Sequence, residues 1–515
     1  GSPYFWTAIK NCHILVYIFL GIIILAFIWG FIKTPVNKKY SFKKLSIVLI
    51  VFLSLHTITP MFLGKANTDL VWNTWKNPRN VYLSFNDSNK SMQVSGFFEY
   101  SIRDFYVTYL RDQKLDESEL DLLAEIYDET SSDNTNKYTG KYEGKNLIFL
   151  QLEGIDSWLL NKEDTPTLYK MMTKSINFSS NHYSFYTGGG STFNSEFAVN
   201  TGFIVPISYN QNAYSFSNNK FPYSMANLFK SEGYTVNAFH MNTKEYYSRS
   251  INYDSWGYDH YYGLVDMEEY NDDTYELDRE LITNEDFSNL MFPEDKKFVD
   301  YIITYSAHLP FTNTSGVCKL LYDLDNLDTD NEFVEMTEEE CARRQAAETD
   351  YMVSLLLDKL EANGLLDDTI IVVFTDHYLY TLNDQSILDK YKETDNNLIN
   401  NTPFFIWDNG KTKKTIDDVT SQLNILPTVL NLFGIDYDSI NYIGTDALDS
   451  DYDGIVFFSD YSWYDGNVYV DGGEVTNKGK IKDILLEEKN TYVNNLIIRN
   501  DLTLKYNYFN ILEKK

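Results

Sequence analysis

The stretch NLIFLQLEG, residues 146–154, is a short apolar run that ends in a carboxylate and a glycine. A continuous apolar run of this length, bounded by turn residues, is typical of a strand buried on both faces. The segment before it, SSDNTNKYTGKYEGK at 131–145, is rich in turn residues and is typical of a linker. The stretch therefore predicts the first strand of a domain that begins near Asn146.

Similar apolar runs recur along the rest of the chain and alternate with segments of helical periodicity. The runs are TVNAFH, FVDYIITYS, TIIVVFT and TPFFIW, which begin at Thr235, Phe298, Thr369 and Thr402. Helices are predicted within 224–234, over 338–363 and over 422–435. Strands without polar alternation occur where helices cover both faces of a parallel sheet. The pattern predicts an α/β fold with a mostly parallel sheet flanked by helices.

Side chains that can bind metal or move protons follow these runs. They are Glu153, His240, His308, Asp376 and His377. In open α/β sheets, ligand sites form beyond the carboxyl ends of the strands. We therefore expect these five side chains to converge on one edge of the sheet.

Two carboxylates and an imidazole among them, Glu153, Asp376 and His377, suggest a divalent metal site. An Asp-His pair can be purely structural, but a carboxylate at a second strand end strengthens the metal hypothesis. Oxygen and imidazole ligands suit Mn²⁺, Mg²⁺ or Zn²⁺. A hydroxyl held at such an ion loses its proton more readily and becomes a nucleophile.

The stretch TGGGSTFNSEF, residues 187–197, supplies candidate hydroxyls directly after three glycines. Three interpretations are open: a phosphate cradle, a turn that presents a nucleophile at the start of a helix, and a flexible surface loop. The phosphate loop of nucleotide hydrolases requires a lysine before the hydroxyl residue, and none precedes Ser191 or Thr192. If the metal site exists, the glycines would bring Thr192 to it.

Charge is distributed unevenly along the chain. The net charge is −31, and the first 65 residues contain seven lysines and no acidic residue, which leaves −38 on the remainder. A domain this acidic would repel nucleic acid, so we exclude nucleic-acid partners.

Two uncharged segments, residues 14–32 and 45–64, are near the roughly 20 residues that span a bilayer as a helix. A buried hairpin of a soluble domain is the alternative. Five lysines in the link at 33–44 place that link in the cytoplasm. Both outer helix ends, and the acidic domain, would then lie outside the cell.

The chain begins with Gly1-Ser2, which we interpret as a cloning scar on a membrane region that has lost upstream helices. Four parts are expected. They are a transmembrane hairpin at 1–65, a linker or collar at 66–145, a catalytic domain at 146–449 and an acidic C-terminal subdomain at 450–515.

Three cysteines occur, Cys12, Cys318 and Cys341. Cys318 and Cys341 fall in the predicted outer domain, where oxidising conditions permit a disulfide. Two free buried thiols are the alternative.

Five motifs follow one another in the order NLIFLQLEG, GGGSTFNSEF, FHMNTKEYYSR, SAHLPF and FTDHY. In this order they resemble the lipoteichoic acid synthase family. Members of that family are membrane-anchored phosphoglycerol transferases with a sulfatase-like, alkaline-phosphatase-type extracellular domain. TPFFIW, LNILPTVLNLFGID and GTD at 444–446 extend the similarity, which covers about residues 146–446 and the apolar hairpin.

The resemblance implies a specific set of metal-site residues. The metal ligands of the family fall on Glu153, Thr192, Asp376 and His377. Thr192 is also implied as the nucleophile, because the spacing T-x-x-x-E-F selects it over Ser191.

The family's substrate-binding positions fall on His240, Asn242, Tyr247, Arg249 and His308. Arginine suits a phosphate because its planar fork matches two oxygens at once, although a lone arginine can also be a solvated surface residue. His308 is implied as the group that protonates the leaving oxygen. Tyr247 stands where relatives usually have Trp, and Asn242 stands where they often have an acid, so both departures concern the substrate side of the site.

The resemblance implies transfer of glycerol phosphate from phosphatidylglycerol, through a phosphothreonine-type intermediate, to a teichoic-acid or glycan acceptor, with release of diacylglycerol. Mn²⁺ is the expected metal, with Mg²⁺ or Zn²⁺ as alternatives. The expected location is the membrane of a Gram-positive bacterium, with several spans and the catalytic domain outside. The oligomeric state stays open.

Two other classes of protein are considered. One is a phosphoethanolamine transferase or another hydrolase of the alkaline-phosphatase fold; the C-x-P-x-R nucleophile motif of sulfatases is absent. The other is a catalytically dead, membrane-tethered binding protein. That class predicts the loss of a metal ligand or the nucleophile, yet all four implied positions hold chemically competent residues.

Overall fold

The computed structural model describes residues 14–33, 42–66, 77–84, 88–109, 116–128, 134–186, 191–206, 213–266, 277–293, 296–326, 333–477 and 479–513. Contacts divide the chain into two compact units, Gly1–Lys65 and Ala66–Lys515.

The described residues of the first unit form two helices in the predicted apolar segments. They are α2 (Ile14–Lys33) and α3 (Phe42–Ile58), and a 3-10 turn (Thr59–Leu63) follows α3. By the combined criteria of length and hydropathy, no helix in the described part of the chain qualifies as a membrane span. The transmembrane hairpin therefore stays a prediction.

The second unit is built on an eight-stranded sheet with the order β5-β4-β6-β1-β7-β8-β2-β9. Only β8 runs antiparallel to the other seven strands. The predicted mostly parallel sheet is therefore confirmed. The strands are β5 (His260–Tyr262), β4 (Thr235–His240), β6 (Phe298–Ile303), β1 (Asn146–Leu152), β7 (Thr369–Thr375), β8 (Phe404–Trp407), β2 (Ile176–Asn177) and β9 (Lys414–Thr415).

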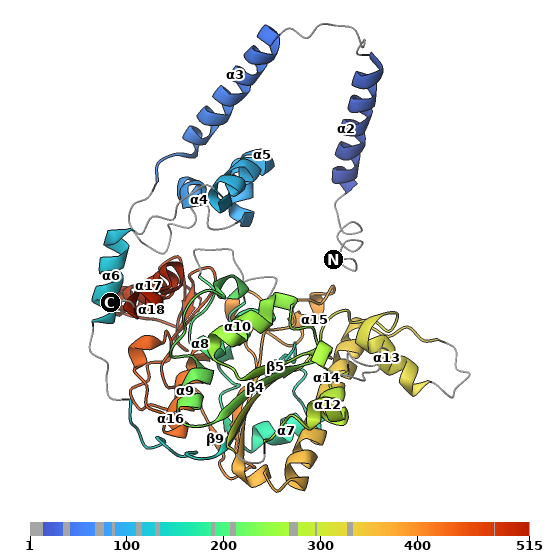
Figure 1. Cartoon of the computed structure of the whole chain (residues 1–515), viewed down its shortest axis with the longest axis vertical. Helices are drawn as coiled ribbons and strands as arrows, with labels where there is room; N and C mark the ends of the chain where they lie inside the picture. Colours follow the sequence, from blue (N-terminus) through green and yellow to red (C-terminus); the bar gives the residue numbers. More distant parts are fainter. Residues whose placement is uncertain are drawn as a thin grey trace. The chain divides into compact units, whose positions relative to one another are not determined.

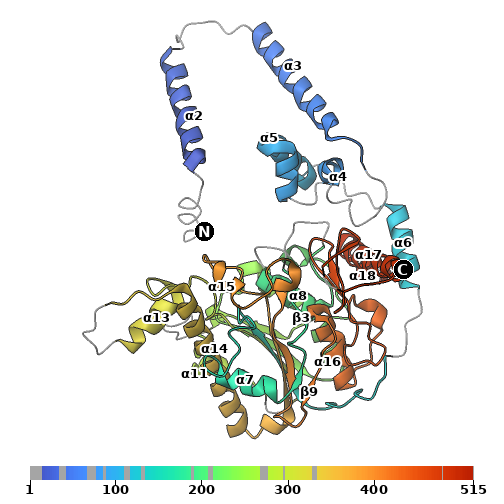
Figure 2. The same ribbon diagram turned by 180° about the vertical axis from the view of Figure 1, so that it is seen from behind.

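Helices cover both faces of this sheet (Figure 1, Figure 2). Alternate residues of β1 point into two separate cores, with Leu147 and Phe149 in one and Ile148 and Leu150 in the other. One core is closed by α8 (Ser191–Thr201), α9 (Met225–Ser231), α10 (Arg249–Trp256) and α16 (Ile425–Phe433). The other is closed by α7 (Pro166–Thr173), α11 (Glu280–Thr283), α12 (Glu285–Ser288), α14 (Glu338–Ala362) and α15 (Ser386–Asp389). This arrangement explains why the strands lack polar alternation.

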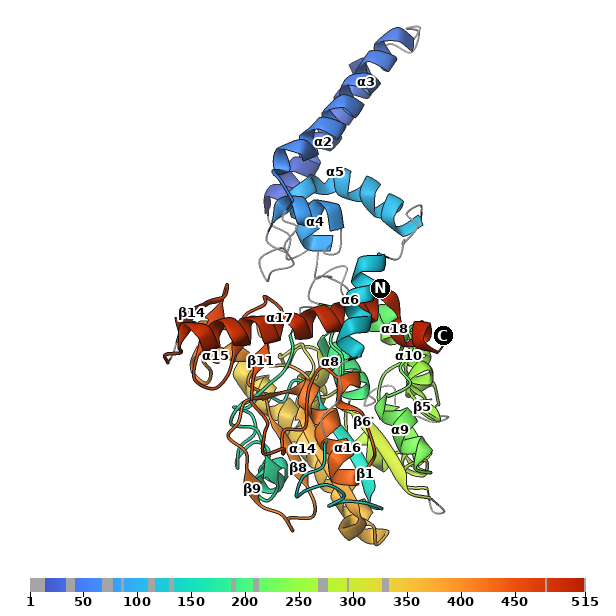
Figure 3. The same cartoon turned by 90° about the vertical axis from the view of Figure 1, so that its left-hand side faces the viewer.

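A second, four-stranded antiparallel sheet follows the main domain. Its strands are β11 (Val456–Phe457), β12 (Trp463–Tyr464), β13 (Tyr469–Asp471) and β14 (Glu474–Asn477), followed by α17 (Asp483–Tyr506) and α18 (Tyr508–Leu512). Helix α6 (Glu117–Tyr127) crosses α17 (Figure 3). The rings of Tyr127 and Tyr508 stack with centroids 4.9 Å apart, and Glu119 pairs with Lys505. The segment before the catalytic domain therefore packs against the C-terminal helices. The other helices of this unit are α4 (Pro78–Ser84), α5 (Ser88–Tyr109) and α13 (Gly316–Asp325).

Asp300 is a fully buried carboxyl in the central strand β6. Its Oδ2 accepts a hydrogen bond from the Phe292 amide at 3.2 Å, and its Oδ1 has no partner among the described residues. Asn237 lies beside it on β4 and also has an unpartnered Oδ1. Burial raises the pKa of Asp300 to about 8. The carboxyl group is therefore protonated in the folded protein at neutral pH.

We expect Asp300→Asn to stabilise the protein at pH 8 and to change its stability little near pH 4. The folded state keeps a proton that the unfolded state releases above its ordinary pKa, so the stability contributed by protonated Asp300 is lost as pH rises toward 8. The free energy of unfolding falls by about 1.4 kcal/mol for each pH unit between about pH 4, the ordinary pKa of the unfolded carboxyl group, and about pH 8. Thermal midpoints of wild type and variant from pH 4 to pH 8 would measure it, with exposed Asp451→Asn as the control. Parallel pH profiles for wild type and Asp300→Asn would contradict the expectation.

Cys318 on α13 and Cys341 on α14 form a disulfide. Both residues are buried, and the bond closes a loop with a sequence separation of 23. The enclosed chain is acidic and includes residues 327–332, which lie outside the described part. A covalent link reduces the conformational freedom of this loop in the unfolded chain.

We expect Cys318→Ser with Cys341→Ser to lower the free energy of unfolding by about 3 kcal/mol, because the loop regains its freedom when the chain unfolds. Denaturant titration of the double variant and of Cys12→Ser, which leaves the bond intact, would measure the difference. Peptide mapping without reductant gives an independent check. Two free thiols in that map, or equal stability of the two proteins, would refute it.

Candidate active site

Glu153, Asp376 and His377 form a buried group at the carboxyl edge of the sheet. Glu153 follows β1, and Asp376 and His377 follow the neighbouring strand β7. One ligand atom of each lies within 4.8 Å of the others. His377 Nε2 is 3.4 Å from Glu153 Oε1 and 3.3 Å from Asp376 Oδ2. The structure thus brings together the three side chains for which the sequence predicts a metal site.

Gly154 allows the loops after β1, β6 and β7 to meet closely. Its φ is +59°, and a Cβ there would lie 3.0 Å from the Ala307 carbonyl oxygen and 3.1 Å from Leu379 Cδ1. Its amide donates to Asp376 Oδ1 at 3.0 Å. A side chain at this position would force the loop after β1 away from the loops after β6 and β7, which explains the glycine after Glu153.

The donor set fits a divalent cation. Asp376 Oδ2 is buried and accepts no hydrogen bond from any described residue. His377 Nδ1 lies 3.0 Å from the Tyr378 carbonyl oxygen and donates to it, so Nε2 is the ring nitrogen that faces the carboxylates and would bind a cation in place of a proton. Burial and the charge of Glu153 raise the pKa of Asp376. Burial alone would lower the pKa of His377, but the charges of Asp376 and Glu153 raise it to about 9. A bound cation would compensate the two buried carboxylates.

Thr192 lies beside this group at the start of α8. Its Oγ1 donates to Glu153 Oε2 at 3.0 Å. Its backbone carbonyl accepts from Gln151 Nε2 at 3.2 Å, and Tyr301 in turn donates to the Gln151 amide oxygen. Ser191 instead interacts with Tyr380. The predicted glycine run falls on residues 187–190, which lie outside the described part of the chain.

Two buried side chains connect helix α8 with the loop after β7. Ser195 Oγ donates to the Asp376 carbonyl oxygen at 2.7 Å, and Gln422 Nε2 donates to the same oxygen at 2.8 Å. The helix that carries Thr192 and the loop that carries Asp376 and His377 therefore have a fixed relation. Gln151, Ser195 and Gln422 could not be predicted from the sequence, because buried amides and hydroxyls carry no motif.

His240 and His308 belong to two neighbouring strands, β4 and β6. His240 is the last residue of β4, and His308 lies in the loop that follows β6. His240 is buried, with Nδ1 2.9 Å from the Ile303 carbonyl oxygen. Burial and the charge of Arg249 lower the pKa of His240 to about 3, so its ring is neutral at neutral pH. His308 Nδ1 is 2.9 Å from the Leu309 carbonyl oxygen, which leaves its Nε2 available.

The loop that carries His308 is held from beneath by polar side chains of the helical layer. Gln345 Nε2 on α14 donates to the carbonyl oxygens of Ser306, at 2.9 Å, and His308, at 2.7 Å. Asp278 accepts from the Tyr305 amide at 2.6 Å. The position of His308 is therefore set by α14 and does not depend on a free loop.

Arg249 is almost fully buried at the start of α10. Its Nη2 donates to Glu196 Oε1 at 2.6 Å, and the guanidinium lies 5.1 Å from the ring centroid of half-buried Tyr247. The side chain of Asn242 accepts from the Thr243 amide at 2.7 Å. Arg249 is therefore not the solvated surface residue that the sequence left open. Its predicted contact with a phosphate stays a prediction.

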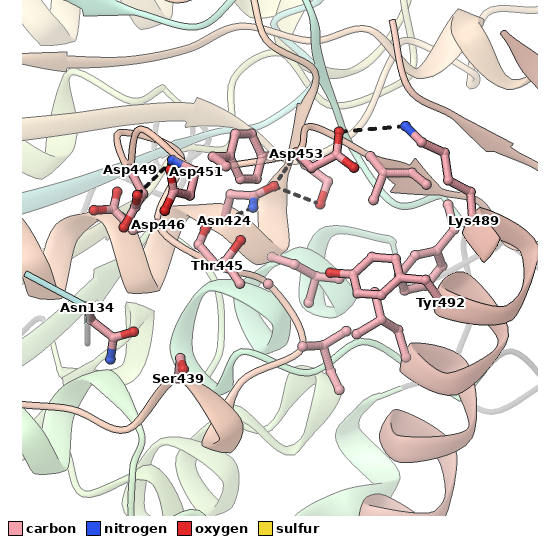
Figure 4. A pocket seen from close by; sticks show the side chains of 18 of the residues that line it. Asn134, Asn424, Ser439, Thr445, Asp446, Asp449, Asp451, Asp453, Lys489 and Tyr492 are labelled. Carbon is pink, nitrogen blue, oxygen red and sulfur yellow. Dashed lines mark hydrogen bonds and ion pairs between the residues drawn. The ribbon is translucent and has the colours of Figure 1, made fainter. Parts of the chain in front are cut away.

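A cavity of about 470 Å³ lies apart from this group, beside α17 (Figure 4). None of its lining residues belongs to the predicted site. Asp446 accepts hydrogen bonds from Asn136 and Asn431, and Lys489 lies 3.6 Å from Asp453 and 2.8 Å from Asp465. Asp446 therefore links α16 to the segment before β1, while Asp453 and Asp465 hold Lys489 of α17, and no chemistry is assigned to them.

The sulfatase family profile matches residues 145–435 of the chain, more than half of its length. This span begins at β1 and ends after α16, and it contains every predicted metal-site and substrate-binding residue. The chain belongs to the sulfatase family.

Relatives within this family support the resemblance seen in the ordered motifs. The chain is 25% identical over 520 residues to a lipoteichoic acid synthase of Staphylococcus saprophyticus, covering 95% of the chain and 76% of the relative. It is 25% identical over 446 residues to lipoteichoic acid synthase 2 of Bacillus subtilis, covering 82% of the chain and 65% of the relative. The crystal structure of the lipoteichoic acid synthase LtaP from Listeria monocytogenes shares the fold, with a TM-score of 0.59 at 23% identity over 75% of this chain and 98% of that one.

Proposed function

We propose that this sulfatase-family protein is a metal-dependent phosphoglycerol transferase. It takes glycerol phosphate from phosphatidylglycerol, releases diacylglycerol and passes the group to a teichoic-acid or glycan acceptor. The observation that carries the proposal is the Thr192 hydroxyl 3.0 Å from Glu153, beside Asp376 and His377. The relatives named as lipoteichoic acid synthases supply the substrate class.

Glu153, Thr192, Asp376 and His377 would hold a divalent metal ion, with Mn²⁺ the first candidate and Mg²⁺ or Zn²⁺ the alternatives. When bound, the ion lowers the pKa of a neighbouring hydroxyl and stabilises negative charge on phosphoryl oxygens. Gly154 and Gln422 fix the loop of Asp376 and His377 through hydrogen bonds. A preorganised site of this kind does not have to rearrange during the reaction.

Thr192 Oγ would attack phosphorus, and the bond from phosphorus to the diacylglycerol oxygen would break. The Thr192 hydroxyl donates a hydrogen bond to Glu153 Oε2, which gives its proton a path away from Oγ as the bond to phosphorus forms. His308 donates a proton to the leaving oxygen, and Arg249 faces the phosphoryl oxygens. An acceptor hydroxyl then gives its proton to His308 and attacks phosphorus, the bond from phosphorus to Thr192 Oγ breaks, and Oγ regains its proton through the hydrogen bond with Glu153.

The first 65 residues would anchor the enzyme in the membrane, with the catalytic domain outside a Gram-positive cell. This placement rests on the apolar runs and the lysine-rich link. A tethered domain has a high local concentration of donor lipid, which offsets the repulsion between its net −38 and an anionic bilayer. Positive groups at the site, the metal ion and Arg249, would provide the recognition.

Comparison of donor lipids tests the proposal against transfer of phosphoethanolamine. The full chain in detergent, supplied with Mn²⁺, should release diacylglycerol from phosphatidylglycerol and much less from phosphatidylethanolamine. Preference for phosphatidylethanolamine would replace the phosphoglycerol assignment. Release from neither lipid, with metal bound, would support a catalytically dead binding protein.

A further inference from the structure

Glu196 and Arg249 form an ion pair that is closed to solvent. Their side chains are 0% and 1% exposed. Arg249 Nε lies 3.2 and 3.1 Å from the two Glu196 oxygens, and Nη2 lies 2.6 Å from Oε1. The Tyr253 hydroxyl donates to Oε2 at 2.8 Å. The edge of the guanidinium formed by Nε and Nη2 is therefore occupied by the Glu196 carboxylate, which has no direct role in the proposed chemistry.

The pair connects the nucleophile to the arginine through one helix. Glu196 lies four residues after Thr192 on α8, so the two side chains are one turn apart. Arg249 follows Tyr247 and Ser248, which both have positive φ values, 57° and 52°. Non-glycine residues in this region are uncommon and are held there by their surroundings. The backbone is bent to bring Arg249 to Glu196.

Arg249 Nη1 is buried and has no hydrogen-bond partner among the described residues. A buried donor without a partner is costly, and such groups are usually used by a ligand or by water. The guanidinium also lies 6.0 Å from the ring centroid of Phe193, the residue that follows Thr192 on α8. The unused nitrogen therefore belongs to a guanidinium that lies beside the helical turn of Thr192.

We propose that Glu196 is a positioning residue that orients Arg249 so that Nη1 binds a phosphoryl oxygen of the substrate. This inference rests on the proposed phosphoglycerol transfer for its substrate, but the anion site itself needs only a phosphate. The fork of Arg249 can rotate about its side chain, and the double contact with Glu196 removes that freedom. Thr192 and Glu196 lie on the same helix, α8. A phosphorus atom whose oxygen is bound by Arg249 would therefore stay aligned with the Thr192 hydroxyl.

A role in charge balance alone makes the opposite prediction. Glu196 lowers the positive potential around Arg249, so its neutralisation would strengthen the binding of an anion if orientation did not matter. A positioning role predicts weaker binding, because Nη1 would lose its direction. The sign of the change in phosphate affinity therefore separates the two roles.

Calorimetric titration of inorganic phosphate into the full-length protein, saturated with Mn²⁺ in detergent, tests the inference. Glu196→Gln should weaken phosphate binding about tenfold, as expected for one charge-assisted hydrogen bond. Glu196→Asp keeps the charge and should retain more affinity than Glu196→Gln. Mn²⁺ affinity should be unchanged in both variants. Asp465→Asn, which disrupts the nearly buried pair of Asp465 with Lys489, is the matched control and should bind phosphate like wild type.

A double-mutant cycle identifies the residue through which Glu196 acts. In an Arg249→Ala background, Glu196→Gln should cost less than about twofold further affinity. Equal or tighter phosphate binding by Glu196→Gln would overturn the inference, as would additive effects. If Glu196→Gln does not fold, Glu196→Asp provides the test, because its shorter side chain should disturb the double contact with Arg249. Phosphate affinity of Glu196→Asp equal to that of wild type would then overturn the inference. A coupled pair in a protein that releases no diacylglycerol from phosphatidylglycerol would refute the proposed function and leave the positioning role intact.

Discussion

Thr192→Ala is expected to lower the release of diacylglycerol from phosphatidylglycerol by at least about 10³-fold, as for loss of a covalent nucleophile. Thr192 Oγ1 is the hydroxyl that reaches Glu153, at 3.0 Å, so no other described side chain is placed to take over the attack. Ser191→Ala is the matched control from the same turn of α8, and it should keep activity within a few-fold of wild type. Ser191→Ala removes one oxygen and Thr192→Ala removes one oxygen and one methyl group, so the fold should survive both changes.

Turnover assays on wild type and the two variants, with thermal melting of each, would measure this difference. Equal loss of activity in both variants at unchanged stability would indicate that the turn matters as a unit. Loss in Ser191→Ala with retention in Thr192→Ala would exchange the two roles and contradict the assignment.

Removal of the metal is expected to stop turnover completely, and added Mn²⁺ should restore it. The reason is the pair of buried carboxylates, Glu153 and Asp376, whose combined negative charge a divalent ion would balance once His377 binds it as a neutral ring. Asp376→Asn should weaken Mn²⁺ binding by at least about 100-fold, because it removes a charged ligand from a closed site. Metal content after dialysis and turnover against added Mn²⁺ are the two measurements.

Exposed Asp395→Asn, on the same connection, is the control and should behave like wild type in both measurements. Full activity of the wild-type protein in excess chelator, with no metal detected, would show that Thr192 is activated by protein groups alone. Unchanged Mn²⁺ affinity of Asp376→Asn would place the ion elsewhere.

The central strands could be predicted from the sequence because burial on both faces requires an uninterrupted run of apolar residues. NLIFLQL and TIIVVFT are buried at every position, and both are neighbours in the sheet. Glu153, Asp376 and His377 were found for the same reason, since each follows such a run and parallel strands end at one edge. The antiparallel direction of β8 could not be predicted, because the apolar pattern of TPFFIW does not indicate in which direction the strand runs.

The residues that hold the site residues in position could not be predicted, because their roles depend on contacts between segments that are distant in the sequence. Glu196 pairs with Arg249 at a separation of 53 residues, and Gln422 reaches Asp376 over 46. A single glutamate in the mostly polar stretch STFNSEFAVNT is a weak signal, although its spacing of four residues from Thr192 was available. Burial of Arg249 was equally hidden, since a lone arginine is ordinarily solvated.

The central claim is that Thr192 takes the glycerophosphoryl group from phosphatidylglycerol. Mass spectrometry of the Mn²⁺-loaded full chain, quenched in acid after brief incubation with this lipid and without acceptor, tests it most directly. The account predicts a mass increase of one glycerophosphoryl group, located by fragmentation on Thr192 and absent in Thr192→Ala. Diacylglycerol release with no protein adduct, or with the adduct on another residue, would contradict it.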